Sequence, residues 1–278
     1  MPVDRYADAG DFLGAAESWL SVDEVANNVM LSVARSLADG TRTLKEPPYF
    51  AAATDGGEID CCAMQTPPHR ILLTNGTPGG LADLAADAFE ARGRVPGVLG
   101  PSAATAAFAE EWLRLAGGQA RVTMRQRLHK LERVNAHLPH VPGDLREAEQ
   151  GDRALAVEWV SAFAREALPG EPNEAEQGVD RYLKARSLYF WECGGAVSMC
   201  ASAGVVGSVA RINAVYTPPA LRGRGYATAA VAALTRKLLA GGCHYCCIYT
   251  DLANPISNGV YDRIGYRPVY DLDLYTFS

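Results

Sequence analysis

Residues 212–239 constrain the fold most, because they pass from a β-branched strand through a proline pair into an amphipathic helix. The helix opens with Arg222-Gly223-Arg224-Gly225-Tyr226-Ala227. Prolines stop the strand, and glycines let the backbone approach a ligand closely. The N-terminus of a helix presents unpaired N–H groups at the positive end of the helix dipole. This segment therefore predicts an anion site. Pyrophosphate suits it, since it accepts several N–H bonds and a guanidinium contact at once.

Other phosphate-binding loops fit these residues less well. A Rossmann turn needs G-x-G-x-x-G with an acidic residue about 20 positions later, whereas this loop has one glycine pair only. A P-loop needs Gly-Lys-Ser or Gly-Lys-Thr, and neither occurs in the chain. Taken alone, the hexapeptide leaves a glycine-softened turn with basic surface residues as an alternative.

With its flanks, the segment resembles the GNAT superfamily of N-acetyltransferases, whose acetyl-CoA motif is [RQ]-x-x-G-x-[GA]. Arg222, Gly225 and Ala227 fill its defining positions. Residues 254–266, Asn-Pro-Ile-Ser-Asn-Gly-Val-Tyr-Asp-Arg-Ile-Gly-Tyr, resemble the family's N-x-x-[SA]-x-x-[VIL]-Y-x-x-x-G-[FY] helix. The resemblance covers about residues 144–278. It implies an α/β (α+β) fold with a mixed central sheet flanked by helices.

The resemblance also implies acetyl-CoA (coenzyme A) as the cofactor and assigns residues to it by position. The pantetheine would pair as a pseudo-strand with Val215, Tyr216 and Thr217, and an N–H near Val215 would polarise the thioester carbonyl. The pyrophosphate would be held by the loop and the first helical turn, which comprise Arg222, Gly223, Arg224, Gly225, Tyr226, Ala227 and Thr228. Asn254 and Ser257 would line the far side of the cofactor.

Tyr261 is the catalytic residue that the resemblance implies. Its phenol, with an ordinary pKa near 10, would protonate the departing thiolate. A core aromatic on the buried face of the helix is the alternative. The strand at residues 209–215 offers no carboxylate as a general base. Ordered water or a carboxylate from elsewhere, for instance Glu166, Glu171 or Glu174, would then take the proton of the amine.

The implied activity is N-acyltransferase chemistry: transfer of an acetyl (acyl) group from coenzyme A to a primary amine, by direct attack in a ternary complex. The acceptor would be a small-molecule or peptide amine. An aminoacyl transferase of tandem GNAT-like fold is one alternative, although Arg222 and Gly225 favour coenzyme A over transfer RNA. A non-catalytic coenzyme A-binding sensor or scaffold is the other.

Chain length and a linker-like segment predict two domains, 1–141 and 142–278, because residues 135–143 hold two prolines and a closing glycine. The tripeptide Thr-Pro-Pro follows an apolar strand at residues 66–68 and again at 217–219. This echo predicts that the two halves share a fold, with the N-terminal half a degenerate GNAT-like domain without the arginine-glycine loop. In that half, Asn75-Gly76 and Gly79-Gly80 precede a helix. They could form an anion site, and a flexible loop is the alternative.

Local patterns predict most elements of this fold. We expect helices within residues 11–39, and a hairpin of strands 49–54 and 59–65 around Asp55-Gly56-Gly57. We also expect Asp152 to cap the helix 154–167 and residues 205–216 to form one strand. The remaining expected strands are 71–73, 122–134, 145–148, 188–192, 197–201, 245–250 and 267–277, and the remaining helices are 81–91, 103–115, 179–186, one containing residues 231–239, and 254–264.

Charge and cysteine content exclude several function classes. The net charge of −6 argues against nucleic acid and anionic membranes as partners, because these select clustered Lys and Arg. No signal-like or bilayer-length apolar run is present, so we expect a cytoplasmic protein. The seven cysteines are an odd number, which does not suit a framework of disulfides, so we expect reduced core residues. Cys243-x-x-Cys246 is not accompanied by the second pair of ligands that a metal site needs. The oligomeric state stays open, with a homodimer as one alternative.

Overall fold

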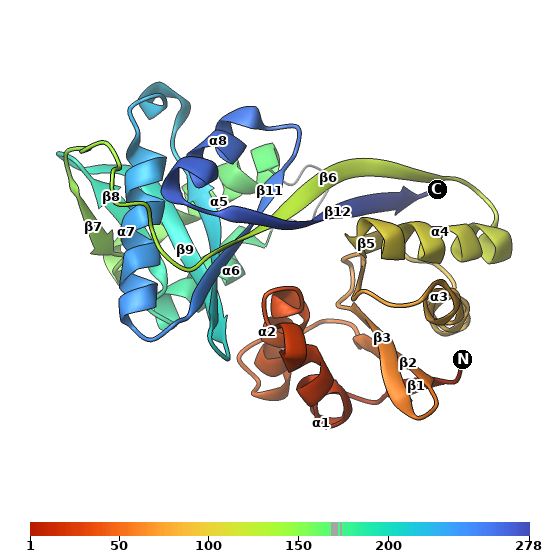
Figure 1. Cartoon of the computed structure of the whole chain (residues 1–278). Coiled ribbons are helices and arrows are strands. Elements are labelled where there is room, and N and C mark those ends of the chain that lie inside the picture. Colours follow the sequence, from red (N-terminus) through yellow and green to blue (C-terminus); the bar gives the residue numbers. More distant parts are fainter. Residues whose placement is uncertain (168–171, 173) are drawn as a thin grey trace. The chain divides into compact units, whose positions relative to one another are not determined.

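The computed structural model describes residues 1–167, 172 and 174–278, and its contacts divide the chain into two compact units (Figure 1). Unit 1 contains Met1–Arg127 together with the C-terminal segment Tyr270–Ser278. Unit 2 contains Leu128–Val269. The division expected after residue 141 therefore lies inside unit 2.

Hydrogen bonds explain why the expected linker belongs to unit 2. The Asn135 amide donates to the Ile264 carbonyl at 2.8 Å. The indole N–H of Trp191 donates to the Pro142 carbonyl at 3.0 Å. Because both bonds join residues far apart in sequence, proline and glycine content alone did not reveal them.

Unit 1 begins with a short strand, Val3–Tyr6, that the sequence pattern did not predict. Its elements in chain order are β1 (Val3–Tyr6), α1 (Ala9–Leu20), the 3-10 turn η1 (Ser21–Asp23), α2 (Asn28–Ala38), β2 (Tyr49–Asp55), β3 (Glu58–Gln65), β4 (Ile71–Leu73), α3 (Pro78–Arg92), β5 (Gly97–Pro101), α4 (Ser102–Ala116) and β6 (Ala120–Leu131), whose last residues enter unit 2. Most of β12 (Arg267–Phe277) returns to unit 1.

The sheet of unit 1 has the strand order β1-β2-β3-β4-β5-β12. The predicted hairpin is present, with β2 and β3 antiparallel, whereas β4 and β5 are parallel. Side chains alternate between the faces of β2. Phe50 stacks on Phe12 of α1 with ring centroids 5.0 Å apart, while Ala51 joins the core that contains Leu84 of α3 and Phe108 of α4. Helices therefore cover both faces of this sheet.

Unit 2 repeats the order strand, two helices, three strands, helix, strand, helix, strand. Its elements are β7 (Asp144–Glu147), the 3-10 turn η2 (Gln150–Asp152), α5 (Arg153–Ala167), α6 (Ala175–Lys184), β8 (Leu188–Glu192), β9 (Ala196–Val206), β10 (Val209–Tyr216), the 3-10 turn η3 (Pro219–Leu221), α7 (Tyr226–Ala240), β11 (Tyr245–Asp251), α8 (Pro255–Ile264) and the start of β12. Its strand order is β11-β10-β9-β8-β7.

Two buried clusters lie on the two sides of this sheet. One contains Val231 and Leu234 of α7 together with Tyr261 and Ile264 of α8. The other contains Trp159 of α5 and Val179 of α6, together with residues of β8, β9 and β10. The mixed α/β fold with helices on both faces, expected from the sequence, is confirmed.

The element order also repeats in unit 1, but the Thr-Pro-Pro echo that suggested the repeat is misleading. Thr66 follows β3, the third strand of unit 1, whereas Thr217 follows β10, the fourth strand of unit 2. Moreover, residues 66–68 lead into β4 rather than into a helix. The stretch of unit 1 equivalent to the arginine-glycine loop is therefore residues 74–77, between β4 and α3.

Two further local predictions are wrong. Residues 205–216 form the end of β9 and all of β10, because Gly207, with φ of +54°, and Ser208 make a two-residue hairpin turn between paired Val206 and Val209. Asp152 does not cap α5 but ends η2, where its carboxylate accepts from the Glu149 amide in a capping box.

The described helices and cysteines agree with a chain that folds by burying apolar side chains. Among the described residues, no helix combines the length and apolarity that a bilayer crossing requires. All seven cysteines are free thiols, and five of them, Cys61, Cys62, Cys200, Cys246 and Cys247, are buried.

The pairing of β5 with β12 provides a test of unit 1. Gly97 has φ of +155°, and a Cβ added there would collide with the Tyr275 carbonyl oxygen. We expect Gly97→Ala to lower the free energy of unfolding by about 2–4 kcal/mol in urea denaturation, because the two strands must separate. Gly93→Ala is the control, since Gly93 also has positive φ (+66°) but open space around it. It is expected to cost about 1 kcal/mol. Equal losses for both variants would contradict the pairing.

Candidate functional site

The pairing between β10 and β11 ends partway along β10. Their parallel pairing covers only residues 209–211 of β10, and the last pair is Arg211 with Cys247. On the other side, β10 stays paired with β9 as far as Tyr216 and Met199. Residues 212–216 therefore present one edge of backbone N–H and C=O groups that β11 does not satisfy, and such groups require another partner.

A β-bulge lies on this unpaired stretch. Ala214 and Val215 stand opposite the single residue Cys200, because the register jumps between the pairs Asn213–Ala201 and Tyr216–Met199. Ala214 has φ of +48°, which is uncommon for a residue with a side chain. The bulge reverses the alternation of side chains, so that Ile212 packs with α7 whereas Ala214 and Tyr216 pack in the cluster of α5.

The amides of residues 223–228, where the loop after β10 passes into α7, have no hydrogen-bond acceptor among the described residues. Gly223 and Gly225 have φ of +77° and +82°, and Gly225 is the N-cap of α7 without a side-chain hydrogen bond. The first helical bond runs from the Ala229 amide to the Gly225 carbonyl at 3.0 Å. In the part of the chain that the structure describes, no acceptor lies against the amides of residues 223–228. The loop itself, residues 222–225, is exposed.

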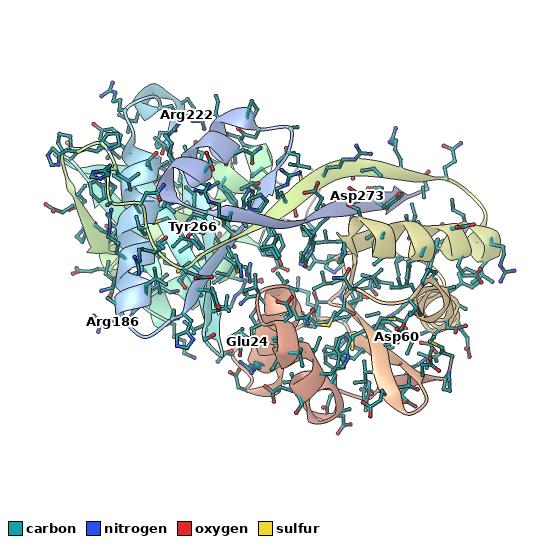
Figure 2. All side chains as sticks on the ribbon, in the orientation of Figure 1. Glu24, Asp60, Arg186, Arg222, Tyr266 and Asp273 are labelled. Atoms are coloured by element: carbon teal, nitrogen blue, oxygen red, sulfur yellow. The ribbon has the colours of Figure 1, made fainter. Side chains whose placement is uncertain are left out.

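Arg222 fixes the shape of this loop (Figure 2). Its Nε donates to the Thr217 carbonyl at 2.8 Å, its Nη2 donates to Glu166 Oε2 of α5 at 2.7 Å, and its guanidinium lies 5.7 Å from the centre of the Tyr216 ring. Arg224 makes a longer contact, 3.5 Å to the Ala220 carbonyl, and is exposed. Of the two arginines, Arg222 is thus occupied by the protein, while Arg224 reaches toward solvent.

Ser198 anchors the end of β10 and was not predicted. Its buried hydroxyl donates to the Tyr216 carbonyl at 3.1 Å and lies 2.8 Å from the Thr217 hydroxyl. The only sequence signal was a serine inside the apolar run Val197 to Ala201. Together with Arg222, Ser198 holds the end of the strand and the start of the loop at a fixed separation.

Comparison with known proteins agrees with this geometry. A sequence model described as the acetyltransferase (GNAT) family matches residues 155–266. That range contains the parted strands, the glycine-capped helix and α8. Residues 155–266 therefore form a GNAT-family domain. No match was found among curated proteins.

Solved structures show that the likeness of fold extends over the whole chain. A GNAT-family acetyltransferase from Colwellia psychrerythraea is 11% identical with a TM-score of 0.63, and all of each chain is covered. A GCN5-related N-acetyltransferase from Sphaerobacter thermophilus is 15% identical with a TM-score of 0.62, covering 98% of this chain and 94% of that one. A tandem GNAT protein from the clavulanic acid biosynthesis pathway is 12% identical with a TM-score of 0.58, covering 100% and 98%. The predicted tandem GNAT-like architecture is confirmed at the level of fold.

The second GNAT motif lies on α8 and begins with a helix cap. Asn254 is the N-cap residue, and its Oδ1 accepts from the Ser257 amide at 3.0 Å. This bond gives Asn254 a structural role of its own. The side chain of Ser257 in turn forms a hydrogen bond with Tyr261, one helical turn further on.

Tyr261 lies in the core of the GNAT domain with 5% of its surface exposed. Its ring packs edge-on against Tyr266, with centroids 5.9 Å apart. Burial raises the pKa of Tyr261 to about 12, and the hydrogen bond to Ser257 offsets part of this rise. The phenol therefore keeps its proton at neutral pH. The neighbouring thiol of Cys200 is also held protonated, because complete burial raises its pKa.

Two of the three carboxylates considered as general bases, Glu166 and Glu174, have basic partners. Glu166 is paired with Arg222, as described above. Glu174, the N-cap of α6, has its Oε2 4.0 Å from Nη2 of Arg181 in the same helix. Glu171 lies outside the described residues. Among the described residues, no group of three or more His, Cys, Asp and Glu side chains is arranged to hold a metal ion.

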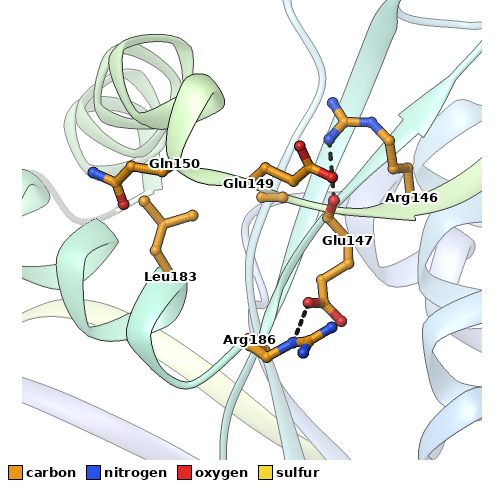
Figure 3. A pocket seen from close by; sticks show the side chains of 7 residues that line it. Arg146, Glu147, Glu149, Gln150, Leu183 and Arg186 are labelled. Carbon is orange, nitrogen blue, oxygen red and sulfur yellow. Dashed lines mark hydrogen bonds and ion pairs between the residues drawn. The ribbon is translucent and has the colours of Figure 1, made fainter.

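A pocket of about 490 Å³ lies in unit 2 beside β7 (Figure 3). It is lined by Arg146, Glu147, Ala148, Glu149, Gln150, Leu183 and Arg186. Its cations are neutralised within the protein, since Arg146 pairs with Asp152 and Glu192, and Arg186 pairs with Glu147. None of these residues belongs to the predicted cofactor set.

The raised pKa of Tyr261 predicts how the domain responds to alkali. An unfolded tyrosine ionises near pH 10, whereas the folded Tyr261 ionises near pH 12. The stability contributed by this phenol is therefore complete below pH 10 and is lost as the pH rises through 12. In urea titrations from pH 8 to 11, wild type should lose up to about 1.4 kcal/mol per pH unit more than Tyr261→Phe. Parallel losses in the two proteins would contradict this burial.

Proposed function

We propose that this protein is an N-acyltransferase that transfers an acyl group, most simply acetyl, from coenzyme A to a primary amine. The observation that carries the proposal is the row of unpartnered amides at residues 223–228, at the N-terminus of a long helix and next to a parted strand pair. The domain's membership of the GNAT family supports acyl transfer, and the site's own residues suit the cofactor part by part.

The loop suits the pyrophosphate of coenzyme A. Amides at a helix N-terminus and the helix dipole favour anions. Gly223 and Gly225 have positive φ, so the backbone turns at this point without a side chain in the way. Arg224 adds a positive charge that the described protein does not neutralise with a carboxylate. Arg222 would act through its bond to the Thr217 carbonyl, by holding the loop at the end of β10.

The edge of β10 suits the pantetheine arm. An extended chain with alternating amide groups can pair with an exposed strand edge. Val215 is the second residue of the bulge, and Tyr216 and Thr217 follow it. Acetyl-CoA supplies an activated thioester when bound. The amide near Val215 is the donor that we assign to the thioester oxygen, because the bulge displaces this stretch from regular pairing with β9.

Tyr261 is the residue that we assign to the leaving thiolate. A group that gives up a proton must first hold it, and the buried phenol does so throughout the neutral range. For the amine, β10 has no carboxylate and Glu166 is held by Arg222. Ordered water is therefore the proton acceptor that we favour. The acceptor is a small-molecule or peptide amine.

The activity is tested directly by incubating the purified protein with acetyl-CoA and a mixed library of primary amines. We expect one class of amine to gain the mass of an acetyl group, together with release of free thiol, as measured by mass spectrometry. Tight binding of coenzyme A without any acetylated product would instead identify a coenzyme A-binding sensor.

The role of Tyr261 is tested by Tyr261→Phe. We expect the rate of thiol release to fall roughly 10- to 100-fold, because proton transfer to a leaving group is worth at least that much, while the dissociation constant for coenzyme A is unchanged. Tyr266→Phe is the matched control. Its hydroxyl is also buried but bonds Thr235 at 2.8 Å, so this variant should lose stability and retain the rate per folded molecule. Equal rate losses in both variants would show that Tyr261 is only a core aromatic.

The loop is tested by Gly225→Ala. The substitution forces a side chain into left-handed backbone and places its Cβ 3.0 Å from Val141 Cγ2. We expect coenzyme A affinity to fall at least tenfold in calorimetry, because about 1–2 kcal/mol of strain shifts the amides. Gly242→Ala is the control, since Gly242 has φ of +104° and open space beyond the other end of α7. If Gly242→Ala weakens binding equally, the effect is one of stability and not of the loop.

A further inference from the structure

Unit 1 contains its own version of the arrangement that carries the loop in unit 2. Its fourth strand β4 leads through residues 74–77 into α3, and β5 lies parallel to β4. In unit 2, β10 leads in the same way into α7 beside the parallel β11. A second coenzyme A site would therefore lie at the N-terminus of α3. Two independent features of unit 1 oppose it.

The first feature is that a carboxylate of the chain already fills the N-terminus of α3. Asp60 of β3 (Figure 2) accepts from the Thr77 amide at 3.0 Å and from the Thr77 hydroxyl at 2.9 Å. The Thr77 hydroxyl in turn accepts from the Gly80 amide at 3.2 Å, and Pro78 has no N–H. A Cβ on Gly80 would collide with Asp60 Oδ2. The amides of Thr77 and Gly80 are thus bonded within the chain, next to a negative charge, whereas those of residues 223–228 in unit 2 have no such partner among the described residues.

The second feature is that β4 ends almost where its pairing with β5 ends: the last pair is Leu72 with Leu99, whereas β10 continues through residues 212–216 past its last pair with β11. β4 ends at Leu73, and a Cβ added to Gly100 of β5 would lie 3.0 Å from both the Leu73 Cβ and the Leu73 carbonyl oxygen. On its other side the chain after β4 stays attached to β3, as β10 does to β9: the Thr74 amide donates to the Cys62 carbonyl at 3.0 Å and the Cys62 amide donates to the Thr74 hydroxyl at 2.8 Å. Among its described residues, unit 1 therefore lacks a strand edge as long as residues 212–216 for a pantetheine arm.

We propose that Asp60 occupies in unit 1 the place that a phosphate takes in unit 2, so that unit 1 binds no coenzyme A and each chain binds one molecule. This proposal rests on the proposed function only for the site in unit 2. The glycines at 76 and 80 are explained by the close approach of β3, and not by a ligand: Cβ atoms at both positions would collide with Cys61 or Asp60. Residues 75–80 are therefore neither an anion site nor a vestige of one that is still open.

Titration calorimetry with coenzyme A tests the stoichiometry on the full chain. We expect one molecule per chain for wild type and none for Gly225→Val, whose folding is verified by circular dichroism. Two molecules per wild-type chain, or binding that persists in Gly225→Val, would overturn the proposal. No binding to wild type would overturn the proposed function and leave unit 1 without a ligand, as proposed. Hydrogen exchange gives the same answer if Gly225→Val does not fold: saturating coenzyme A should protect the amides of residues 223–228 and not those of residues 76–82.

A separate experiment tests whether Asp60 takes the place of a phosphate at the N-terminus of α3. In the Gly225→Val background, Asp60→Ala removes the carboxylate at the N-terminus of α3 and leaves its donors unpaired. Inorganic pyrophosphate at ten times its dissociation constant should then raise the melting temperature by about 3 °C relative to the same protein with Asp60 intact. If the alanine variant is too unstable, Asp60→Asn is used instead; it removes the negative charge but keeps one oxygen that can accept from Thr77, so a smaller rise is expected. Identical responses with and without the Asp60 carboxylate would show that it is an ordinary helix cap and would overturn this part of the proposal.

Discussion

The break in the ladder between β10 and β11 is the constraint on which the GNAT domain depends. Polar backbone groups that leave a ladder must find another partner, and residues 212–216 do so on one edge only. The bulge at Ala214 and the glycine cap at Gly225 enlarge the set of unsatisfied groups. Ser198 and Arg222 then hold these groups in place, since one fixes the end of the strand and the other ties Thr217 to Glu166 of α5. The site is built mainly of backbone, and side chains serve chiefly to position it.

The two units show how one fold carries different chemistry. Both have a parallel strand–helix–strand arrangement at the same place in the element order. In unit 2 the amides of residues 223–228 have no partner among the described residues, whereas in unit 1 Asp60 and Thr77 accept from the amides of Thr77 and Gly80. The two units thus differ in a few contacts at the N-termini of α3 and α7. This agrees with the general finding that function belongs to a site and not to a fold.

Burial decides which of the titratable side chains in this domain keep their protons at neutral pH. Burial keeps the phenol of Tyr261 neutral, and the same burial raises the pKa of the thiols of Cys246 and Cys247 to about 12, so that they are poor nucleophiles. The proposed direct attack by the amine calls on neither of these thiols. Because Glu166 is bound to Arg222, one of the carboxylates considered as a base is engaged by the loop that would hold the cofactor.

The sequence by itself determined the features that depend on neighbours in the chain. The hairpin at Asp55-Gly56-Gly57 and the glycine turn that opens α7 could be predicted, because turns and periodicity follow from local backbone preferences. Only the tertiary structure decided that residues 128–143 belong to unit 2, that β12 returns to unit 1, that Arg222 pairs with Glu166 and that Asp60 fills the end of α3. Each of these joins residues far apart in sequence, and spacing along a single chain carries no information about which distant groups meet when the sheet is assembled.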